Sequence, residues 1–297
     1  MHKPVVSIAM ITYNHEEFIE QSINGVLMQE CNFEIELLIS NDNSPDNTDS
    51  VIKKILKNHP KANLIKYINR TENVGMMPNF ISTLTQCTGK FIALCEGDDY
   101  WTDPLKLQKQ FDFLESNYDY SMICHNAKII YEGIDKEPIS FNKKKVECDI
   151  NINEIITQWA IPTASIFLRN EIINPLPTWF SEIYSGDFTI ALLCANTGKI
   201  KFLPETMSIY RVNYSGTSAS AVYKDQGIFV FKEHVKLMKY FNDYSKKKHE
   251  LLLINRILYL EKEIKFSTLK QKSFINAFKK MPMLFLNKTF NRLFGVC

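Results

Sequence analysis

Two patterns of hydrophobic and polar positions alternate along the first hundred residues. Four short runs are mostly apolar, which is typical of strands buried on both faces of a parallel sheet. They cover residues 5–12, 34–40, 64–68 and 91–95. The segments between them carry apolar residues at helical spacing, over residues 16–29, 49–58 and 78–88. Repeated strand–helix units predict right-handed crossovers and a doubly wound, mostly parallel α/β sheet.

The alternation becomes less regular after Asp99. The pattern predicts helices over residues 104–117 and 187–197, the second ended by Gly198, and Asn14 is expected to cap the first helix of the chain. Strand candidates follow, with a polar loop among them at 141–149; they cover residues 120–131, 165–168, 200–203 and 207–212. Beyond about residue 223 the pattern is helical throughout. The sequence therefore predicts an α/β domain over residues 1–220 and a helical C-terminal extension over residues 221–297.

Composition and cysteine usage narrow the class of protein. The chain is 45% hydrophobic and 23% charged, so it can bury a core and is not a disordered or fibrous chain. Seven scattered cysteines contain no C-x-x-C pair, which favours a reduced, cytoplasmic protein. No apolar run reaches the roughly 18–20 residues of a transmembrane helix, and the N-terminus lacks the cleavage site of a secretory signal.

Charge is distributed unevenly along the chain. Residues 245–297 carry 12 Lys and Arg against three Glu, a net charge of +9, whereas the preceding residues carry 23 positive and 30 negative side chains. Because the excess of positive charge is confined to one end, general nucleic-acid binding is not expected. Residues 281–296 combine large apolar side chains with Lys288 and Arg292. This pattern is compatible with peripheral contact with the inner face of the cell membrane, and equally with ordinary packing on the body or a homodimer contact.

Polar and acidic side chains follow each of the four predicted strands. Residues 12–14, 41–43, 69–70 and 96–99 stand at these strand ends. Ligands of open α/β sheets bind outside the carboxyl ends of the strands, so these side chains are expected to share a site. The chain has neither a G-x-G-x-x-G nor a P-loop motif, which excludes the usual dinucleotide-binding and P-loop classes. Glu96, Asp98 and Asp99 can instead hold a hard divalent cation, Mn²⁺ or Mg²⁺, which would neutralise a diphosphate; the alternative is that they are solvated helix caps.

Six segments together resemble the motifs of the family 2 glycosyltransferases, which have the GT-A fold. The resemblance runs over roughly the first 115 residues without an evident gap, and the first four motifs occur there in the family's order: 5–14 (VVSIAMITYN), 39–48 (ISNDNSPDNT), 69–79 (NRTENVGMMPN) and 88–109 (TGKFIALCEGDDYWTDPLKLQK). The resemblance resumes at 185–187 (SGD) and 209–213 (IYRVN). It implies a metal-dependent, inverting glycosyltransferase that uses a nucleotide-sugar donor, usually UDP-linked, and a glycan or lipid-linked glycan acceptor of the bacterial cell envelope. No Q-x-x-R-W motif occurs, which argues against a processive polysaccharide synthase.

The resemblance also implies roles for individual residues. The donor nucleotide would be contacted by Thr12, Tyr13, Asn14, Asp42, Arg70, Glu96, Asp98 and Arg211. Asp42 would accept a hydrogen bond from the uracil ring, and the metal would be held by Asp98 and Asp99. Glu96 stands where the family's D-x-D motif begins with Asp, and Asn213 stands where the family carries a metal-ligating His. Arg211 would contact the diphosphate, with a surface ion pair as the alternative.

Asp187 is the expected catalytic base. Transfer of a sugar to a hydroxyl needs a carboxylate opposite the departing diphosphate to accept the proton, and a single displacement inverts the anomeric carbon. The alternative is that Asp187 only caps the helix over residues 187–197, and the two roles are compatible. Trp101 and residues 159–165 are candidates for the acceptor side, although buried aromatic residues more often belong to the core.

Two other functions remain open from the sequence. A sugar nucleotidyltransferase on a related sheet would need a glycine- and lysine-rich phosphate loop near the N-terminus, and residues 11–14 are not one. A non-catalytic nucleotide-sugar-binding protein would bind the nucleotide without turnover. Asp187→Asn would have no effect on such a protein, whereas it would slow sugar transfer by a transferase.

Overall fold

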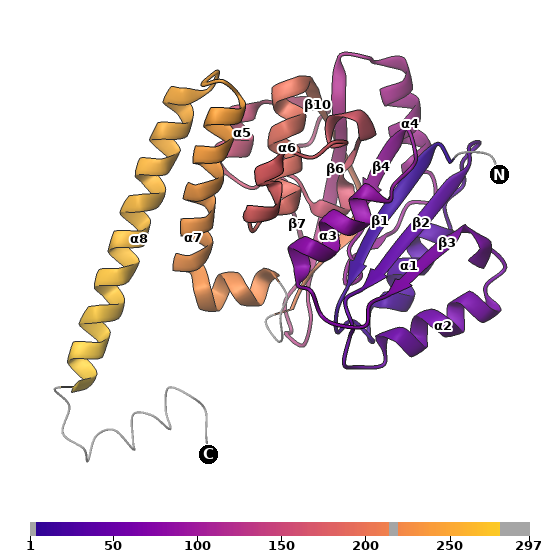
Figure 1. The fold of residues 1–297 in the computed structure, drawn as a ribbon, viewed down its shortest axis with the longest axis horizontal. Coiled ribbons are helices and arrows are strands. Elements are labelled where there is room, and N and C mark those ends of the chain that lie inside the picture. The colour runs from indigo at the N-terminus through magenta and orange to yellow at the C-terminus, as the bar shows by residue number, and fades with distance from the viewer. Residues whose placement is uncertain (1–3, 214–218, 280–297) are drawn as a thin grey trace.

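The computed structural model describes residues 4–213 and 219–279. Its N-terminal part alternates strands with helices as the sequence pattern predicts (Figure 1). These elements are β1 (Val6–Thr12), α1 (Ile19–Leu27), β2 (Ile35–Asn41), α2 (Thr48–Asn58), β3 (Ile65–Asn69), α3 (Met76–Thr85) and β4 (Phe91–Leu94). The four predicted strands and three predicted helices are confirmed.

The rest of the described chain adds strands to the same sheet and helices to its faces. The elements are β5 (Tyr100–Trp101), α4 (Lys106–Ser116), β6 (Tyr120–Tyr131), β7 (Ile139–Ser140), β8 (Cys148–Ile150), α5 (Ile152–Thr157), β9 (Phe167–Arg169), α6 (Gly186–Thr197), β10 (Lys199–Val212), α7 (Ala219–Tyr244) and α8 (Glu250–Lys279). Within the described residues, ten strands form one sheet, and eight of them follow the order β3-β2-β1-β4-β9-β6-β10-β5. β7 pairs with β6, and β8 pairs with β10.

The first four strands of the chain are parallel to one another, and β6 is parallel to β10. β9 lies antiparallel between β4 and β6 and joins these two parallel groups. The two strands expected at 200–203 and 207–212 are one strand, β10, whose register against β6 shifts between Leu203 and Thr206. Pro204 and Glu205 stand at that shift, so the polar interruption in the sequence is a bulge in a continuous strand.

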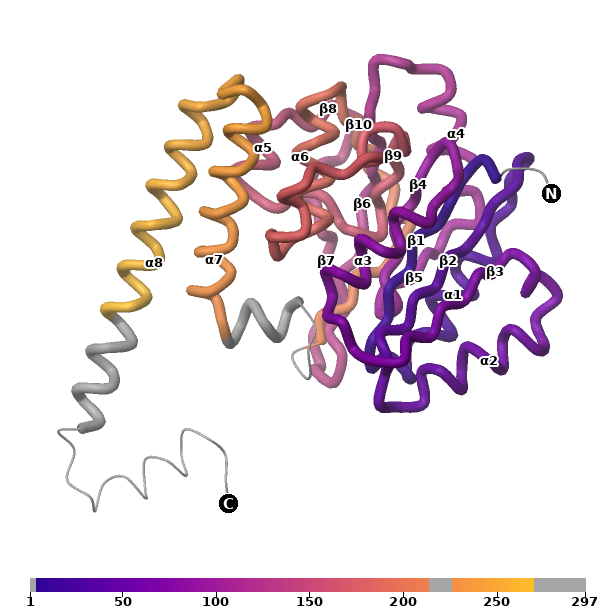
Figure 2. The backbone as a smooth tube through the Cα atoms, in the orientation of Figure 1, coloured from indigo at the N-terminus to yellow at the C-terminus, as the bar shows by residue number. Residues whose placement is uncertain are grey.

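Helices cover both faces of the sheet, which confirms the doubly wound arrangement. One core forms where α1, α2 and α4 pack on the sheet, and a second forms under α3, α5 and α6. Side chains of both C-terminal helices join the second core, among them Phe241 of α7 and Leu253 of α8. Part of α8 is therefore buried against the body, whereas the domain boundary at residue 220 stays a prediction. Figure 2 shows α7 and α8 side by side at the end of the molecule away from β3.

Some local predictions were wrong for identifiable reasons. Asn14 does not cap α1. Its backbone is in the left-handed region, with φ 60°, and a turn over residues 16–18 separates it from the helix, which begins at Ile19. The polar stretch 141–149 is not wholly a loop, since its end forms β8. The next helix, α5, begins with a capping box in which Asn151 and Glu154 exchange hydrogen bonds, a signal present in the sequence that the hydrophobic pattern alone does not reveal.

Candidate active site

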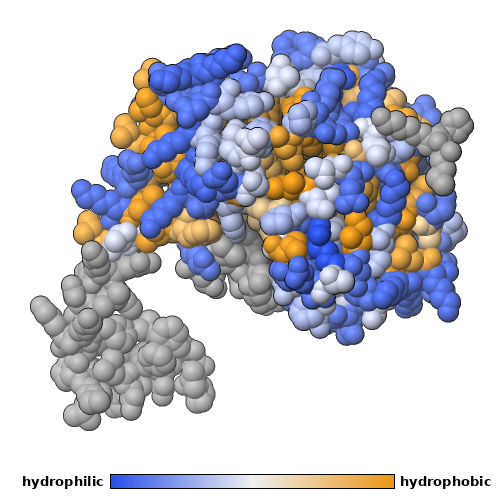
Figure 3. Space-filling model, in the orientation of Figure 1, coloured by the Kyte–Doolittle hydropathy of each residue, from blue (hydrophilic) through white to orange (hydrophobic). Residues whose placement is uncertain are grey.

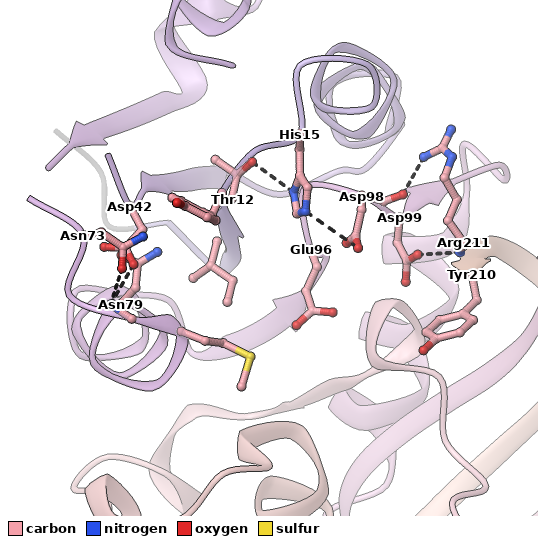
Figure 4. Close-up of a pocket in the computed structure, with 14 residues that line it drawn as sticks. Thr12, His15, Asp42, Asn73, Asn79, Glu96, Asp98, Asp99, Tyr210 and Arg211 are labelled. Atoms are coloured by element: carbon pink, nitrogen blue, oxygen red, sulfur yellow. Dashed lines mark hydrogen bonds and ion pairs between the residues drawn. The ribbon is translucent and has the colours of Figure 1, made fainter. Parts of the chain in front are cut away.

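A cavity of about 300 Å³ lies at the carboxyl ends of β1, β2 and β4, where the strand-end residues were expected to meet. Figure 4 shows Asp42, Asn73 and Asn79 at one end of it and Asp98, Asp99 and Arg211 at the other. Its lining includes seven of the nine residues predicted to bind the donor or the metal: Thr12, Tyr13, Asp42, Glu96, Asp98, Asp99 and Arg211. The remaining two, Asn14 and Arg70, are not part of the lining.

The acidic turn between β4 and β5 supplies three carboxylates. Asp99 is 2% exposed, and its Oδ1 accepts a hydrogen bond from the Arg211 amide at 2.8 Å. Its Oδ2 is buried and has no hydrogen-bond partner among the described residues. The Asp98 carboxylate lies 3.8 Å from His15 Nε2, and Glu96 is half-buried. A buried carboxylate oxygen without a donor is unusual in a folded protein, so it indicates a group that a cation would complete.

The crowding of negative charge perturbs two of these carboxyls. Burial raises the pKa of Glu96 well above its ordinary value, and the charges of Asp98, Asp187 and Asp99 raise it further. Burial and the neighbouring Asp98 likewise raise the pKa of Asp99, against the opposing effect of Arg211. Like charges held close together disfavour ionisation, and a bound cation reverses this effect.

The acidic turn fits a divalent ion that is shared with a bound diphosphate. Within residues 4–213 and 219–279, no group of three or more His, Cys, Asp or Glu side chains could hold a metal ion by itself. Mg²⁺ in proteins is usually bound by one or two carboxylates, with substrate phosphates and water completing its shell. Asp98 and the unpartnered Oδ2 of Asp99 match such a donor set. Asn213, at the position of the family's metal-ligating His, lines neither this cavity nor the second one described below.

The other end of the cavity is organised around Asp42. Its two carboxylate oxygens accept the backbone N–H groups of Val74 and Gly75, both at 2.9 Å. Arg70 Nε lies 3.8 Å from Asp42 Oδ1 and donates a hydrogen bond to Asn79 Oδ1 at 2.7 Å. Arg70 therefore braces Asp42 and Asn79 from behind the cavity wall. The Asp42 carboxylate keeps free lone pairs that could accept a hydrogen bond from a uracil N–H. The uracil contact itself stays a prediction.

Arg211 holds the acidic turn in place. Its Nη1 donates to the Asp98 carbonyl oxygen at 2.5 Å, its Nε donates to Glu132 at 2.9 Å, and its Nη2 donates to Gln21. The guanidinium also lies between two aromatic rings, at 4.8 Å from Phe18 and 4.6 Å from Tyr100. The alternative of an ion pair is confirmed in its partner, Glu132, although the Arg211 side chain is buried and the pair does not lie on the open surface. Its contact with a diphosphate stays a prediction.

Asp187 lies in a second cavity of about 510 Å³ that adjoins the first. Its Oδ2 accepts a hydrogen bond from Thr163 Oγ1 at 2.6 Å, and its Oδ1 accepts the Phe188 amide at 2.7 Å in the first turn of α6. Burial raises the pKa of Asp187 above its ordinary value, although these two hydrogen bonds lower it in part. The two cavities share Ile11, Met76, Glu96 and Tyr210.

Aromatic side chains line the second cavity, but only one of the predicted tryptophans is among them. Trp159 lines it and packs edge-on against Phe188, with 5.6 Å between ring centroids. Trp101 is fully buried and donates its indole N–H to the Ala164 carbonyl at 2.8 Å. The core alternative is therefore correct for Trp101. Residues of α7 and α8 complete the far wall, including His234 and Arg256.

Several residues of the first cavity were not found from the sequence. His15 bridges Thr12 Oγ1, at 3.2 Å from its Nδ1, and Asp98. Asn79 exchanges hydrogen bonds with Ser40, and Asn73 and Tyr210 also line the cavity. Asn73, Asn79 and Tyr210 belong to segments that resemble the family, and His15 directly follows one. The missing signal was which side of the chain each residue faces.

Gly97 in the acidic turn allows the close approach of β1. A Cβ at this position would lie 2.6 Å from Thr12 Oγ1 and 3.0 Å from His15 Nδ1. We expect Gly97→Ala to displace these side chains, to destabilise the fold by about 1–3 kcal/mol and to weaken nucleotide binding about tenfold. Thermal denaturation and calorimetric titration with UDP measure the two effects. Gly227→Ala is the matched control, because nothing lies within 4 Å of its Cβ position; equal affinities for the two variants would contradict the close packing.

Comparison with known proteins shows the family to which the chain belongs. The profile of the family described as Glycosyl transferase family 2 matches residues 7–174, more than half of the chain. An uncharacterised protein of Mycobacterium tuberculosis is 33% identical over 229 residues, 75% of this chain and 63% of the relative, so the chain spans less than two thirds of that relative's length. The GalNAc(5)-diNAcBac-PP-undecaprenol beta-1,3-glucosyltransferase of Campylobacter jejuni is 27% identical, over 70% of this chain and 65% of its own.

Two solved structures share the fold. S. aureus TarS 1-349 in complex with UDP-GlcNAc has a TM-score of 0.59 at 18% identity, covering 78% of this chain and 66% of that one. The mannosyltransferase PcManGT of Pyrobaculum calidifontis, in complex with GDP-Man and Mn²⁺, has a TM-score of 0.57 at 12% identity, covering 94% and 82%. These likenesses confirm the GT-A fold. The chain belongs to glycosyltransferase family 2.

Proposed function

We propose that this protein transfers a hexosyl group, with inversion, from a UDP-linked sugar to a hydroxyl of a glycan or lipid-linked glycan. The observation that carries the proposal is the pair of adjoining cavities. One contains the acidic turn and Asp42, the other contains Asp187, and both are bounded by Glu96 and Tyr210. A transferase needs this arrangement, because the donor and the acceptor must meet at one point from two sides.

In the first cavity, the nucleotide base lies toward Tyr13 and Asp42, and the diphosphate lies toward the acidic turn. Asp98 and Asp99 would hold a Mn²⁺ or Mg²⁺ ion there, which when bound supplies positive charge to the diphosphate. Arg211 keeps the turn rigid through the Asp98 carbonyl and the Asp99 carboxylate. A preorganised turn stabilises developing charge without having to rearrange during the reaction.

In the second cavity, Asp187 takes the proton of the acceptor hydroxyl. As that proton leaves, the acceptor oxygen bonds to the anomeric carbon, and the bond from this carbon to the diphosphate oxygen breaks. Thr163 orients the Asp187 carboxylate, and burial raises its pKa, which makes it a stronger base. With one base and no covalent intermediate, the configuration at the anomeric carbon inverts.

Known proteins support parts of this proposal without establishing them for this chain. TarS has been seen with UDP-GlcNAc and PcManGT with GDP-Man and Mn²⁺, and the name of the C. jejuni relative specifies an undecaprenol diphosphate acceptor. A role in polysaccharide biosynthesis at the cell envelope is consistent with that acceptor. The described helices include none that is both long and apolar enough to cross a bilayer. Residues 281–296, where membrane contact was predicted, lie outside the described residues, and a homodimer stays a prediction.

The reaction itself is tested by product analysis. The purified chain is incubated with a panel of nucleotide-sugars and Mn²⁺, with and without candidate acceptors, and the released products are separated by chromatography. We expect release of a nucleoside diphosphate, slow by hydrolysis and faster with the correct acceptor. Release of pyrophosphate would instead identify a nucleotidyltransferase. Binding of the nucleotide-sugar without turnover of any donor–acceptor pair would identify a binding protein.

A further inference from the structure

Helix α8 has apolar residues on two opposite faces. Its inner face packs on the body, where Leu253 and Leu260 are fully buried. Its outer face exposes large apolar side chains: Leu251 is 75% exposed, Leu258 59%, Phe266 65% and Leu269 57%. A surface helix of a globular protein normally carries one apolar face, so the second face indicates a second contact.

The exposed residues form one stripe along the helix. Leu251, Leu258 and Leu269 are separated by seven and eleven residues, which is close to two and three turns of an α-helix, and Ile254 and Phe266 flank this line. Lys262 and Lys265 fall on the same side at this spacing. Figure 3 shows hydrophobic and hydrophilic side chains alternating along this outer edge of the molecule.

The charges favour one occupant of this stripe. No acidic residue follows Glu263, whereas residues 264–297 contain seven Lys and Arg. If a second copy packed along the stripe, Lys262 and Lys265 of the two copies would lie in one interface and repel each other. An anionic lipid surface offers both partners at once, acyl chains for the leucines and phosphates for the lysines.

We propose that the outer face of α8, formed by Leu251, Ile254, Leu258, Lys262, Lys265, Phe266 and Leu269, docks on an anionic lipid bilayer. Arg256 projects from the inner side of the same helix and lines the cavity of Asp187. Docking through the outer face would therefore place that cavity one helix diameter, roughly 10–12 Å, from the lipid headgroups. This last step rests on the proposed function, and it assigns a lipid-linked acceptor to the enzyme.

Vesicle sedimentation with the full-length chain tests the docking. The variants are a triple substitution of the stripe (Leu251→Ser, Leu258→Ser, Leu269→Ser) and a matched triple of exposed apolar residues elsewhere (Ile134→Ser, Ile139→Ser, Val146→Ser). With vesicles of phosphatidylcholine and phosphatidylglycerol, we expect the stripe triple to lose at least about tenfold in partition coefficient and the matched triple to bind as the unchanged chain does. Lys262→Gln should cost about fivefold on these vesicles and nothing on pure phosphatidylcholine.

Three results would overturn the proposal. The first is that the stripe triple binds vesicles as well as the matched triple does. The second is that the unchanged chain binds vesicles containing phosphatidylglycerol no better than vesicles of pure phosphatidylcholine. Light scattering could also show a dimer that the stripe triple abolishes, which would assign the face to a second copy. Hydrolysis of the nucleotide-sugar in the absence of vesicles separates this inference from the proposed function, because the stripe triple should keep that activity. If the unchanged chain binds vesicles but releases no nucleoside diphosphate, the proposed function fails and the docking surface stands.

Discussion

Asp187→Asn is expected to lower the rate of sugar transfer by about 10²–10⁴-fold while donor affinity stays unchanged. The asparagine oxygen can still accept the Phe188 amide, and its NH2 group can donate to the Thr163 hydroxyl, which reverses that hydrogen bond, so the local structure survives. It cannot take a proton from the acceptor hydroxyl. Steady-state kinetics with the acceptor and calorimetric titration of the donor measure the two quantities separately.

The pH dependence of transfer gives an independent reading of Asp187. Burial raises the pKa of this carboxyl in the folded protein, and the base acts only when ionised, so the rate should rise with pH through that raised pKa. Thr163→Val removes a hydrogen bond that lowers the pKa, so the acid limb of the profile should move to higher pH. A profile that does not move would show that Asp187 is not the titrating base.

Folding stability should respond with the opposite sign. A carboxyl whose pKa is raised in the fold contributes stability below its unfolded pKa, and this contribution is lost as pH rises through the folded pKa. At neutral pH the asparagine variant should therefore be at least as stable as the unchanged protein in thermal denaturation. Asp243→Asn, an exposed residue of α7, is the control and should change neither rate nor stability. Full activity in Asp187→Asn would remove the residue from the reaction.

The sequence predicts the longer strands of the sheet better than the shortest ones. Strands such as β1 and β4 are mostly apolar because both faces are buried, and that pattern is visible in the chain itself. β9 (Phe167–Arg169) overlaps the strand predicted over residues 165–168. β5 has only two residues and is fixed by its pairing with β10, so it leaves no periodic signal to detect.

The candidate site could be predicted where it depends on topology and not where it depends on side-chain direction. Asp42 and Asp98 line the same cavity because parallel strands end at one edge of a sheet, which the order of strands and helices implies. Arg70 and Asn14 also follow strands, yet neither lines the cavity. The Arg70 side chain donates a hydrogen bond to Asn79, and Asn14 has a left-handed backbone whose N–H donates to Ser44 Oγ. These orientations follow from contacts between distant segments, so a sequence read locally does not contain them.

Asp98→Asn is expected to abolish the metal-dependent part of nucleotide binding and to lower transfer by about 10²–10³-fold, since charge stabilisation by a divalent ion is worth several kcal/mol. Asp98 is a cleaner test than Asp99. The Asp99 carboxylate accepts the Arg211 amide, so its loss would also loosen the acidic turn. The Asp98 carboxylate instead lies 3.8 Å from His15 Nε2, which is a long contact that the turn depends on less.

Two measurements make the Asp98 result specific to the metal. Titration of Mn²⁺ in the presence of UDP, followed by the electron paramagnetic resonance of the free ion, should show bound Mn²⁺ for the unchanged chain and little for Asp98→Asn. Chelation should reduce the unchanged chain to the activity of the variant and leave the variant itself unaffected, because the two changes remove the same interaction. Asp135→Asn, an exposed residue after β6, controls for the loss of one negative charge. If Asp98→Asn keeps its Mn²⁺ and its response to chelation, Asp98 is not a ligand of the ion.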